Sequence, residues 1–282
     1  TASAASTAST ASSASSASSA STASTASSAS SASTGRSARD AVAAPVGLLL
    51  LIALGFLIGE VALYYIFAVV PPDAQLGIVQ KIFYFHVGSA MAMLLIMALA
   101  AFASLADLII PDDRIDATAQ ACIEVGMVFA AIVLTSGPIW ARKSWGTYWT
   151  WEPRLTLTLL LLLLSLAVIA VRGMAADAAL GRRIGASLAV VAAPAGWLIH
   201  VAVERWGGNH PTVLKGGGIQ NADMRIAFWL AVAALLVTGA ALVTLRYRGL
   251  RLDQQLGAAR LALSAHALRS ARDHDHGAPH VG

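Results

Sequence analysis

The sequence contains few charged residues and only one cysteine. Charged residues make up 12% of the 282 residues, whereas hydrophobic residues make up 57%. A soluble domain has about 25% charged residues, so this chain has too few to cover a large apolar core in water. The single cysteine, Cys122, excludes a disulfide framework, a Cys-x-x-Cys redox pair and a cysteine-rich zinc site within the chain. The composition therefore indicates a protein whose outer surface faces lipid.

The net charge of +4 does not indicate a nucleic-acid-binding protein. The basic residues separate the apolar runs and form no continuous basic stripe, which is the pattern expected of residues that orient membrane helices. We therefore expect the protein to lie in a lipid bilayer and to bind no nucleic acid.

Long apolar runs recur from Val46 onward, and six of them approach or exceed the length of about 20 residues that an α-helix needs to cross the hydrocarbon core. Pro and Gly residues lie at or near the ends of these runs, where helix breakers belong. The sequence therefore predicts an all-α, polytopic integral membrane protein with about six transmembrane helices. The predicted segments are approximately Val46–Val70, Ile82–Ile110, Ala117–Ile139, Leu155–Val171, Ala186–Val203 and Met224–Leu245.

Polar segments flank the apolar region on both sides. Residues 1–40 are mostly Ser, Ala and Thr, with nothing to bury, and are predicted to form a disordered tail. Residues 41–248 are predicted to form the six-helix domain, and residues 249–282 a polar cytoplasmic tail. With both termini in the cytoplasm, twelve of the 19 basic residues lie inside and seven outside, a modest bias in the direction of the positive-inside rule.

Tryptophan is concentrated between the third and fourth predicted helices. Four of the seven Trp residues lie between Trp140 and Trp151, and all seven lie at or near the extracytoplasmic side in the predicted orientation. An interfacial belt normally has Trp at both interfaces, whereas clustered indoles provide flat faces and N–H donors for a large planar ligand. The pattern favours a ligand platform over a simple aromatic belt.

Three histidines, His86, His200 and His210, are predicted to lie on the same side as the Trp-rich segment. A single His at a helix end is more often a structural hydrogen-bonding residue. Several at one depth beside clustered indoles instead indicate metal ligation, since two neutral imidazoles on opposite faces make haem iron six-coordinate.

Three charged residues are further functional candidates, two beside the Trp-rich segment and one within a predicted transmembrane helix. The Arg154 guanidinium can bind a haem propionate in a bidentate manner, although an interfacial anchor is the alternative. Glu152 precedes Pro153 at the predicted start of the fourth helix, where capping is at least as good an explanation as ligand contact. Glu60 lies within the first apolar run and is a functional candidate for that reason, but the sequence indicates no partner for it.

The segment WGTYWTWEPRLT, which begins at Trp145, resembles the tryptophan-rich WWD signature of haem-handling proteins of cytochrome c maturation. The Leu-Thr that follows its arginine is similar to the haem exporter protein C family (CcmC) and differs from the larger cytochrome c synthases. Two other stretches agree with that family: KIFYFHV, which contains His86, and HVAVERW followed by HPTVL, which contains His210. The resemblance covers approximately residues 46–245.

This resemblance implies a protein that binds haem at the extracytoplasmic face of a bacterial inner membrane and delivers it without covalent chemistry of its own. Its implied cargo is haem b, and its implied partners are a membrane-anchored haem chaperone and the ABC transporter subunits of the cytochrome c maturation complex. The implied metal ligands are His86 and His210. The implied cofactor-binding residues are Trp145, Gly146, Trp149, Trp151, Glu152 and Arg154.

The chain departs from the family pattern at two places. Glu152 occupies a position where the family usually has Asp, and Trp-Gly-Gly-Asn-His-Pro around His210 replaces a bulkier segment, so His200 is the alternative second ligand. Two other functions remain as alternatives, a cytochrome c synthase and a haem-permease subunit. A synthase usually has more helices and histidines, and a permease is expected to have interrupted helices or charges at mid-bilayer.

Overall fold

The computed structural model describes residues 46–210, 219 and 221–276, with side chains described through residue 269. The predicted tail over residues 1–40 lies outside the described residues. The helices belong to one compact unit that begins at Gly47. Only Val46, the first residue of the first helix, falls outside this unit.

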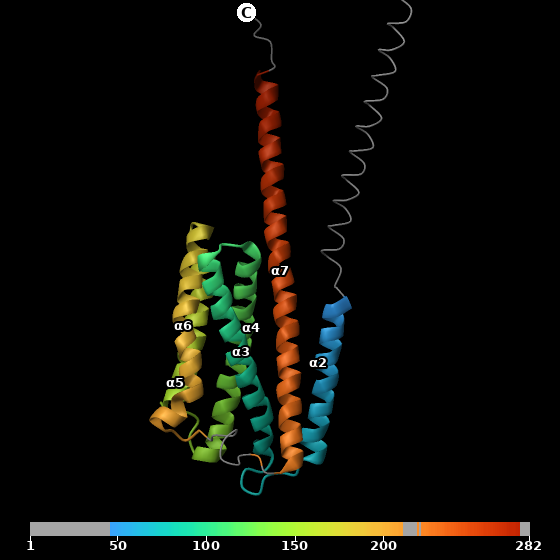
Figure 1. The fold of residues 1–282 in the computed structure, drawn as a ribbon, viewed down its shortest axis with the longest axis vertical. Helices are drawn as coiled ribbons and strands as arrows, with labels where there is room; N and C mark the ends of the chain where they lie inside the picture. Colours follow the sequence, from blue (N-terminus) through green and yellow to red (C-terminus); the bar gives the residue numbers. More distant parts are fainter. Residues whose placement is uncertain (1–45, 211–218, 220, 277–282) are drawn as a thin grey trace, which may run out of the picture. The chain divides into compact units, whose positions relative to one another are not determined.

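The described part of the chain is helical and contains no β-strand (Figure 1). Its six long helices are all long and apolar enough to cross a membrane, which confirms the predicted all-α, polytopic membrane fold. A π-helical turn (η1, Tyr65–Val69) extends α2, and a short 3₁₀ turn (η2, Ile78–Lys81) precedes α3. The long helices are α2 (Val46–Tyr64), α3 (Ile82–Ile109), α4 (Asp113–Trp145), α5 (Pro153–Met174), α6 (Ala178–Trp206) and α7 (Ala222–His276).

Several helices extend beyond the apolar segments predicted for them. α4 continues to Trp145, so that Trp140 and Trp145 lie on a helix and not in a loop. α6 continues past His200 to Trp206, and α7 continues from the membrane segment into the predicted polar tail, as far as His276. Hydrophobicity marks only the part of a helix that lipid surrounds, whereas the backbone hydrogen bonds continue until a cap or a glycine ends them.

Nearby residues determine where α4 and α6 begin and where α4 ends. The Asp112 carboxylate accepts a hydrogen bond from the Arg114 backbone N at 2.7 Å, and the Asp177 carboxylate accepts one from the Ala179 backbone N at 2.9 Å. These carboxylates cap the N-termini of α4 and α6. Gly146 ends α4 with a φ of 76°, a left-handed conformation that favours glycine.

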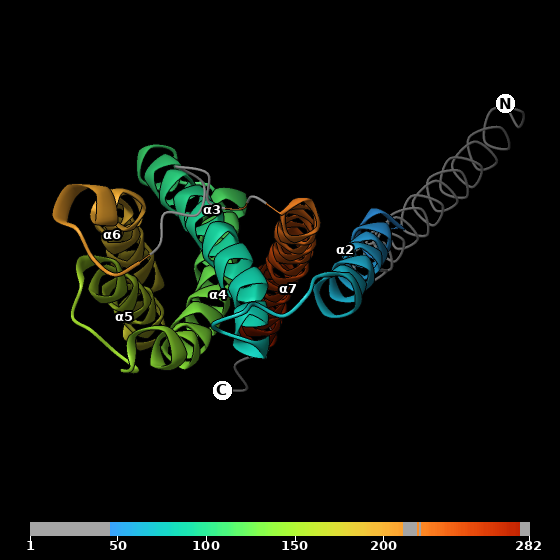
Figure 2. The ribbon, with the colours of Figure 1, turned by 90° about the horizontal axis from the view of Figure 1, so that it is seen from below.

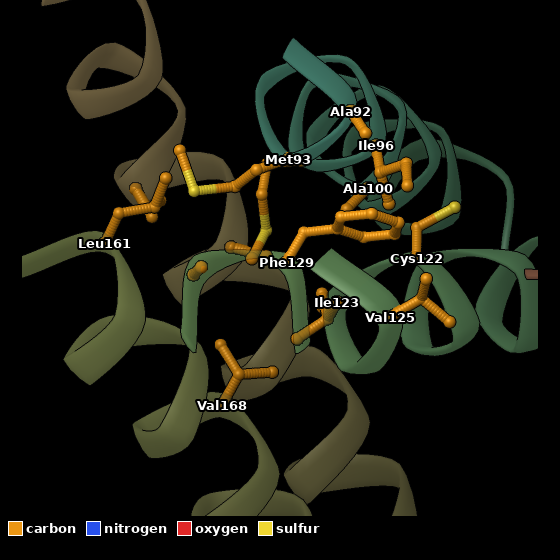
Figure 3. Close-up of a cluster of buried hydrophobic side chains, with 14 of the residues drawn as sticks. Ala92, Met93, Ile96, Ala100, Cys122, Ile123, Val125, Phe129, Leu161 and Val168 are labelled. Carbon is orange, nitrogen blue, oxygen red and sulfur yellow. The ribbon is translucent and has the colours of Figure 1, made fainter. Parts of the chain in front are cut away.

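The bundle is built around α3, which packs against α4, α6 and α7, while α5 packs against α4 and α6 (Figure 2). Side chains from α3, α4 and α5 converge in the main core, among them Met93, Phe129, Leu161 and Val168 (Figure 3). Cys122 lies in the same core as a buried free thiol, which agrees with its interpretation as a small hydrophobic residue.

Lys81 is a buried lysine at the end of the bundle that carries the Trp-rich segment. It is 4% exposed, and its ammonium group donates hydrogen bonds to the backbone carbonyls of Ile66, at 2.5 Å, and Val70. A cation bound to the last carbonyls of a helix is favourable, because those carbonyls have no partner within the helix. This basic residue therefore anchors the end of the α2–η1 segment, and it is not available to an anionic ligand.

A network of ion pairs connects four helices at the opposite end of the bundle. Arg172 on α5 lies 2.8 Å from an Asp116 carboxylate oxygen on α4, and Arg182 on α6 donates to Asp107 on α3 at 2.8 Å and to Asp113 on α4 at 2.8 Å. The Asp107 and Asp116 side chains are only 3% and 8% exposed. The network therefore fastens α3, α4, α5 and α6 together at the end far from the candidate site.

Candidate functional site

The two predicted metal ligands lie beside each other. His86 projects from α3 and His210 follows the C-terminus of α6, and their ring centroids are 6.3 Å apart. Two imidazoles on opposite sides of one metal ion, each at a metal–nitrogen distance of about 2.0–2.1 Å, have centroids roughly 6 Å apart. The pair is therefore spaced to hold a single metal ion between the rings.

Hydrogen bonds set the tautomer of both rings. His86 Nδ1 lies 3.0 Å from Ser136 Oγ, and the Ser136 hydroxyl donates its own proton to the Ile132 carbonyl at 2.6 Å. Ser136 Oγ therefore accepts the proton of His86 Nδ1. His210 Nδ1 lies 2.6 Å from Glu152 Oε1, a carboxylate that only accepts. In each neutral ring Nε2 is then the unprotonated nitrogen, the arrangement found in metal-binding histidines.

Glycine residues allow these two contacts to form. A Cβ atom on Gly137 would approach His86 Cε1 to 3.0 Å, and one on Gly208 would approach Glu152 Oε2 to 2.7 Å. Gly207 and Gly208 also have φ values of 74° and 143°, which disfavour any other residue. The Gly-Gly pair that departs from the family pattern therefore turns the chain so that His210 reaches Glu152 and His86.

Glu152 binds the segment around His210 and does not cap its own helix. Its side chain makes no capping bond to α5, although the residue occupies the N-cap position. Oε2 instead accepts a hydrogen bond from the Asn209 backbone N at 2.8 Å, while Oε1 contacts His210. The capping alternative is therefore wrong, and the carboxylate orients an imidazole.

The surroundings of His210 favour its neutral form. Burial lowers the pKa of His210, and the positive charge of Arg154 acts in the same direction, whereas the hydrogen bond with Glu152 opposes both. The net pKa lies below the ordinary value of histidine. At neutral pH the ring therefore keeps the lone pair that metal binding requires.

A cavity of about 230 Å³ lies next to the two histidines, with walls from α3, α4, α5 and α6. Three indoles line it, those of Trp140, Trp145 and Trp149. The Trp145 ring contacts His210 edge to face, with 5.4 Å between centroids. The indole N–H groups of Trp140 and Trp149 are buried without a hydrogen-bond partner among the described residues. Such donors are costly to bury unsatisfied, and a polar ligand in the cavity would relieve that cost.

Not every predicted residue lines this cavity. Trp151 is 76% exposed and contacts Trp149 edge to face, with 5.7 Å between centroids. Gly146 terminates α4, and its carbonyl accepts a hydrogen bond from Arg142. Neither Trp151 nor Gly146 is among the lining residues, so in this conformation both lie beside the cavity and not in its wall.

Arg154 lines the cavity and also joins two helices. Its Nε donates to the Ile199 carbonyl at 3.2 Å and its Nη2 to the His200 carbonyl at 3.4 Å, which connects the start of α5 to α6. A guanidinium has five N–H donors, so several remain for a carboxylate. His200 is exposed on α6 and borders the cavity, but its ring makes no contact with His86 among the described ring pairs.

Two residues outside the predicted set of metal ligands and cofactor-binding residues also shape this site. Ser136 determines the tautomer of His86, and Trp140 contributes a wall and an unpaired donor. Trp140 lies five residues before Trp145, and the two rings pack edge to face with 5.6 Å between centroids. The cluster of indoles that predicted a ligand platform already includes Trp140, whereas nothing local in the sequence points to Ser136.

Known proteins similar in sequence to this chain share one family description. The family described as Heme exporter protein C matches residues 33–262. Heme exporter protein C of Bradyrhizobium diazoefficiens is 30% identical over 208 residues, which cover 70% of this chain and 79% of that protein. Its counterpart in Escherichia coli strain K12 is 28% identical over 184 residues, which cover 65% and 75%. A putative cytochrome c biosynthesis ccmC-like mitochondrial protein of Marchantia polymorpha is 30% identical over 130 residues, which cover 46% and 57%. Because the family match spans most of the chain, the protein belongs to the heme exporter protein C family.

Proposed function

We propose that this protein binds haem at the extracytoplasmic membrane face and delivers it to a membrane-anchored haem chaperone during c-type cytochrome biogenesis. The observation that carries this proposal is the pairing of His86 and His210, with 6.3 Å between ring centroids and Nδ1 of each ring engaged. The relatives named for haem export and for cytochrome c biosynthesis support the same cargo and process.

The residues around the cavity suit haem b as cargo. Nε2 of His86 and Nε2 of His210 would bind the iron from opposite sides. The indoles of Trp145 and Trp149 provide apolar faces, and the unpaired indole N–H groups of Trp140 and Trp149 provide donors for polar groups of the ligand. The remaining donors of Arg154 suit a propionate.

The two ligands differ in how they are held, which suits a protein that must both capture and release its cargo. His86 lies on a long helix, whereas His210 follows two glycines at the end of α6. We infer that His86 remains attached to the iron longer and that release begins at His210, since glycine backbones change conformation at low cost.

The proposed partners are the haem chaperone and the ABC transporter subunits of the maturation complex, in a bacterial inner membrane. The proposal gives none of the described residues a role in attaching haem covalently to a protein. This distinguishes the proposed function from that of a cytochrome c synthase. A haem-permease subunit is the second alternative, and it would be favoured if purified protein carried no haem.

The proposed orientation places the Trp-rich segment outside the cytoplasm. We expect a reporter inserted near Gly146 to be exposed on the extracytoplasmic side and one inserted near Ala178 to be cytoplasmic, because both termini are proposed to be cytoplasmic. Paired reporters that are active only outside or only inside the cytoplasm measure this directly. The reverse pattern would place the cavity on the wrong side for cytochrome c assembly.

Arg154→Ala is expected to lower haem retention while the bundle stays folded. The substitution removes a charge-assisted contact with a propionate that contributes about 1.5–3 kcal/mol. Arg154→Lys should restore only part of it, because an ammonium lacks the bidentate geometry. Haem content per protein measures the contact with the propionate. The thermal unfolding temperature measures the structural contribution of the hydrogen bonds to the Ile199 and His200 carbonyls. Equal haem content in the wild type, Arg154→Ala and Arg154→Lys would show that Arg154 only connects α5 to α6 and does not bind haem.

A further inference from the structure

α2 packs against the rest of the bundle through a narrow seam. Its buried residues are Leu48, Gly55 and Ala62, which recur every seven residues. At Gly55 the helix approaches α7 so closely that a Cβ atom would lie 3.2 Å from Thr238 Oγ1. Most of the other α2 side chains are exposed, and the helix lies at the edge of the bundle next to α7 (Figure 2).

Glu60 lies on the side of α2 that faces away from this seam. Successive residues of an α-helix are about 100° apart, so Glu60 is roughly 200° from Ala62. The same side presents Phe56, which is 70% exposed, and Phe67, which is 57% exposed. Among the described residues Glu60 makes no hydrogen bond or ion pair, and its side chain is exposed.

The position of Glu60 along α2 places it deep in the membrane. The candidate span is Val46–Val69, and Glu60 lies near its middle. With a rise of 1.5 Å per residue, the carboxylate is roughly 13 Å from the outer end of the span, in a hydrocarbon core about 30 Å thick. An exposed carboxylate at that depth is unfavourable in lipid unless another group pairs with it.

We propose that this side of α2, defined by Phe56, Glu60, Leu63 and Phe67, binds a transmembrane helix of a different membrane protein that presents a basic side chain to Glu60. The basic group neutralises the carboxylate, and the exposed rings supply apolar contact on either side of it. A second copy of this chain fits less well, because a symmetric contact would bring Glu60 against Glu60. The surface lies away from the haem cavity, none of whose lining residues comes from α2, so the proposal extends beyond haem binding.

Site-specific photo-crosslinking in native membranes tests the proposal with the full-length protein. A photoreactive phenylalanine derivative replaces Phe56 or Phe67, and the same derivative at Phe102 is the matched control, since Phe102 is a 71% exposed residue of α3. We expect an adduct from Phe56 and Phe67, and none from Phe102, with a membrane protein whose transmembrane segment contains Lys, Arg or His.

The dependence on Glu60 distinguishes this contact from incidental proximity. Glu60→Leu should lower the adduct yield by roughly five- to tenfold, because a paired charge is lost. Glu60→Asp should retain most of the yield, and the haem spectrum should be the same in wild type and both variants. An adduct that persists in Glu60→Leu, an adduct with a second copy of this chain, or equal yields from Phe56 and Phe102 would each overturn the proposal. Because the haem spectrum is recorded separately, these results do not depend on whether haem binding is confirmed.

Discussion

His86→Ala and His210→Ala are each expected to abolish the low-spin, six-coordinate haem spectrum and to lower the haem content of the purified protein. Each substitution removes one of the two imidazoles whose centroids lie 6.3 Å apart and leaves five-coordinate iron with an open position. The double variant should retain haem only through contacts with the indoles and Arg154. Absorption spectra recorded before and after dithionite reduction measure the result.

Added imidazole and His200→Ala serve as controls for this expectation. Free imidazole is small enough to enter the vacated position, so it should restore the six-coordinate spectrum in each single variant. His200→Ala should keep the spectrum, since the structure brings His210 and not His200 to the ring of His86. If His200→Ala loses the spectrum and His210→Ala keeps it, the ligand assignment is wrong. If all three variants keep it, haem is not held by two histidines.

Arg182→Ala is expected to destabilise the helical bundle by about 3–5 kcal/mol, the usual effect of removing one partner of a buried ion pair. Arg182 is the partner of Asp107, whose side chain is 3% exposed, and it also contacts Asp113 and Asp116. Without the guanidinium, the Asp107 carboxylate remains buried and unpaired. Thermal unfolding in a fixed detergent measures the loss of stability.

Two further variants isolate the buried charge as the cause. Arg183→Ala removes the neighbouring arginine of α6, which is exposed and has no ion pair among the described residues, and it should change stability by less than about 1 kcal/mol. Asp107→Asn combined with Arg182→Ala should recover part of the loss, because an amide costs less to bury than a carboxylate. Equal unfolding temperatures for Arg182→Ala and Arg183→Ala would show that the network does not stabilise the bundle.

Some parts of the site followed from the sequence because their signals are local. The clustering of Trp145 and Trp149 indicated a platform, and the histidines could be assigned to one side of the membrane because alternating spans determine the side of every loop. The tautomer of His86 could not be predicted, since it depends on Ser136, which is distant in sequence. The position of Trp151 depends on how the chain turns between α4 and α5, and no local pattern specifies that turn.

The sequence by itself determined the membrane class and the number of candidate spans, because runs of apolar residues near the length of a bilayer permit few other structures. It also predicted the region of the candidate site, through the clustered Trp residues. Only the tertiary structure decided which histidine meets His86, what Glu152 binds and how Arg154 is used. These outcomes depend on the rotation of each helix about its axis and on contacts between residues far apart in the chain. Packing against neighbouring helices sets both, and in a chain so uniformly apolar the hydrophobic pattern does not reveal which side of a helix faces its neighbour.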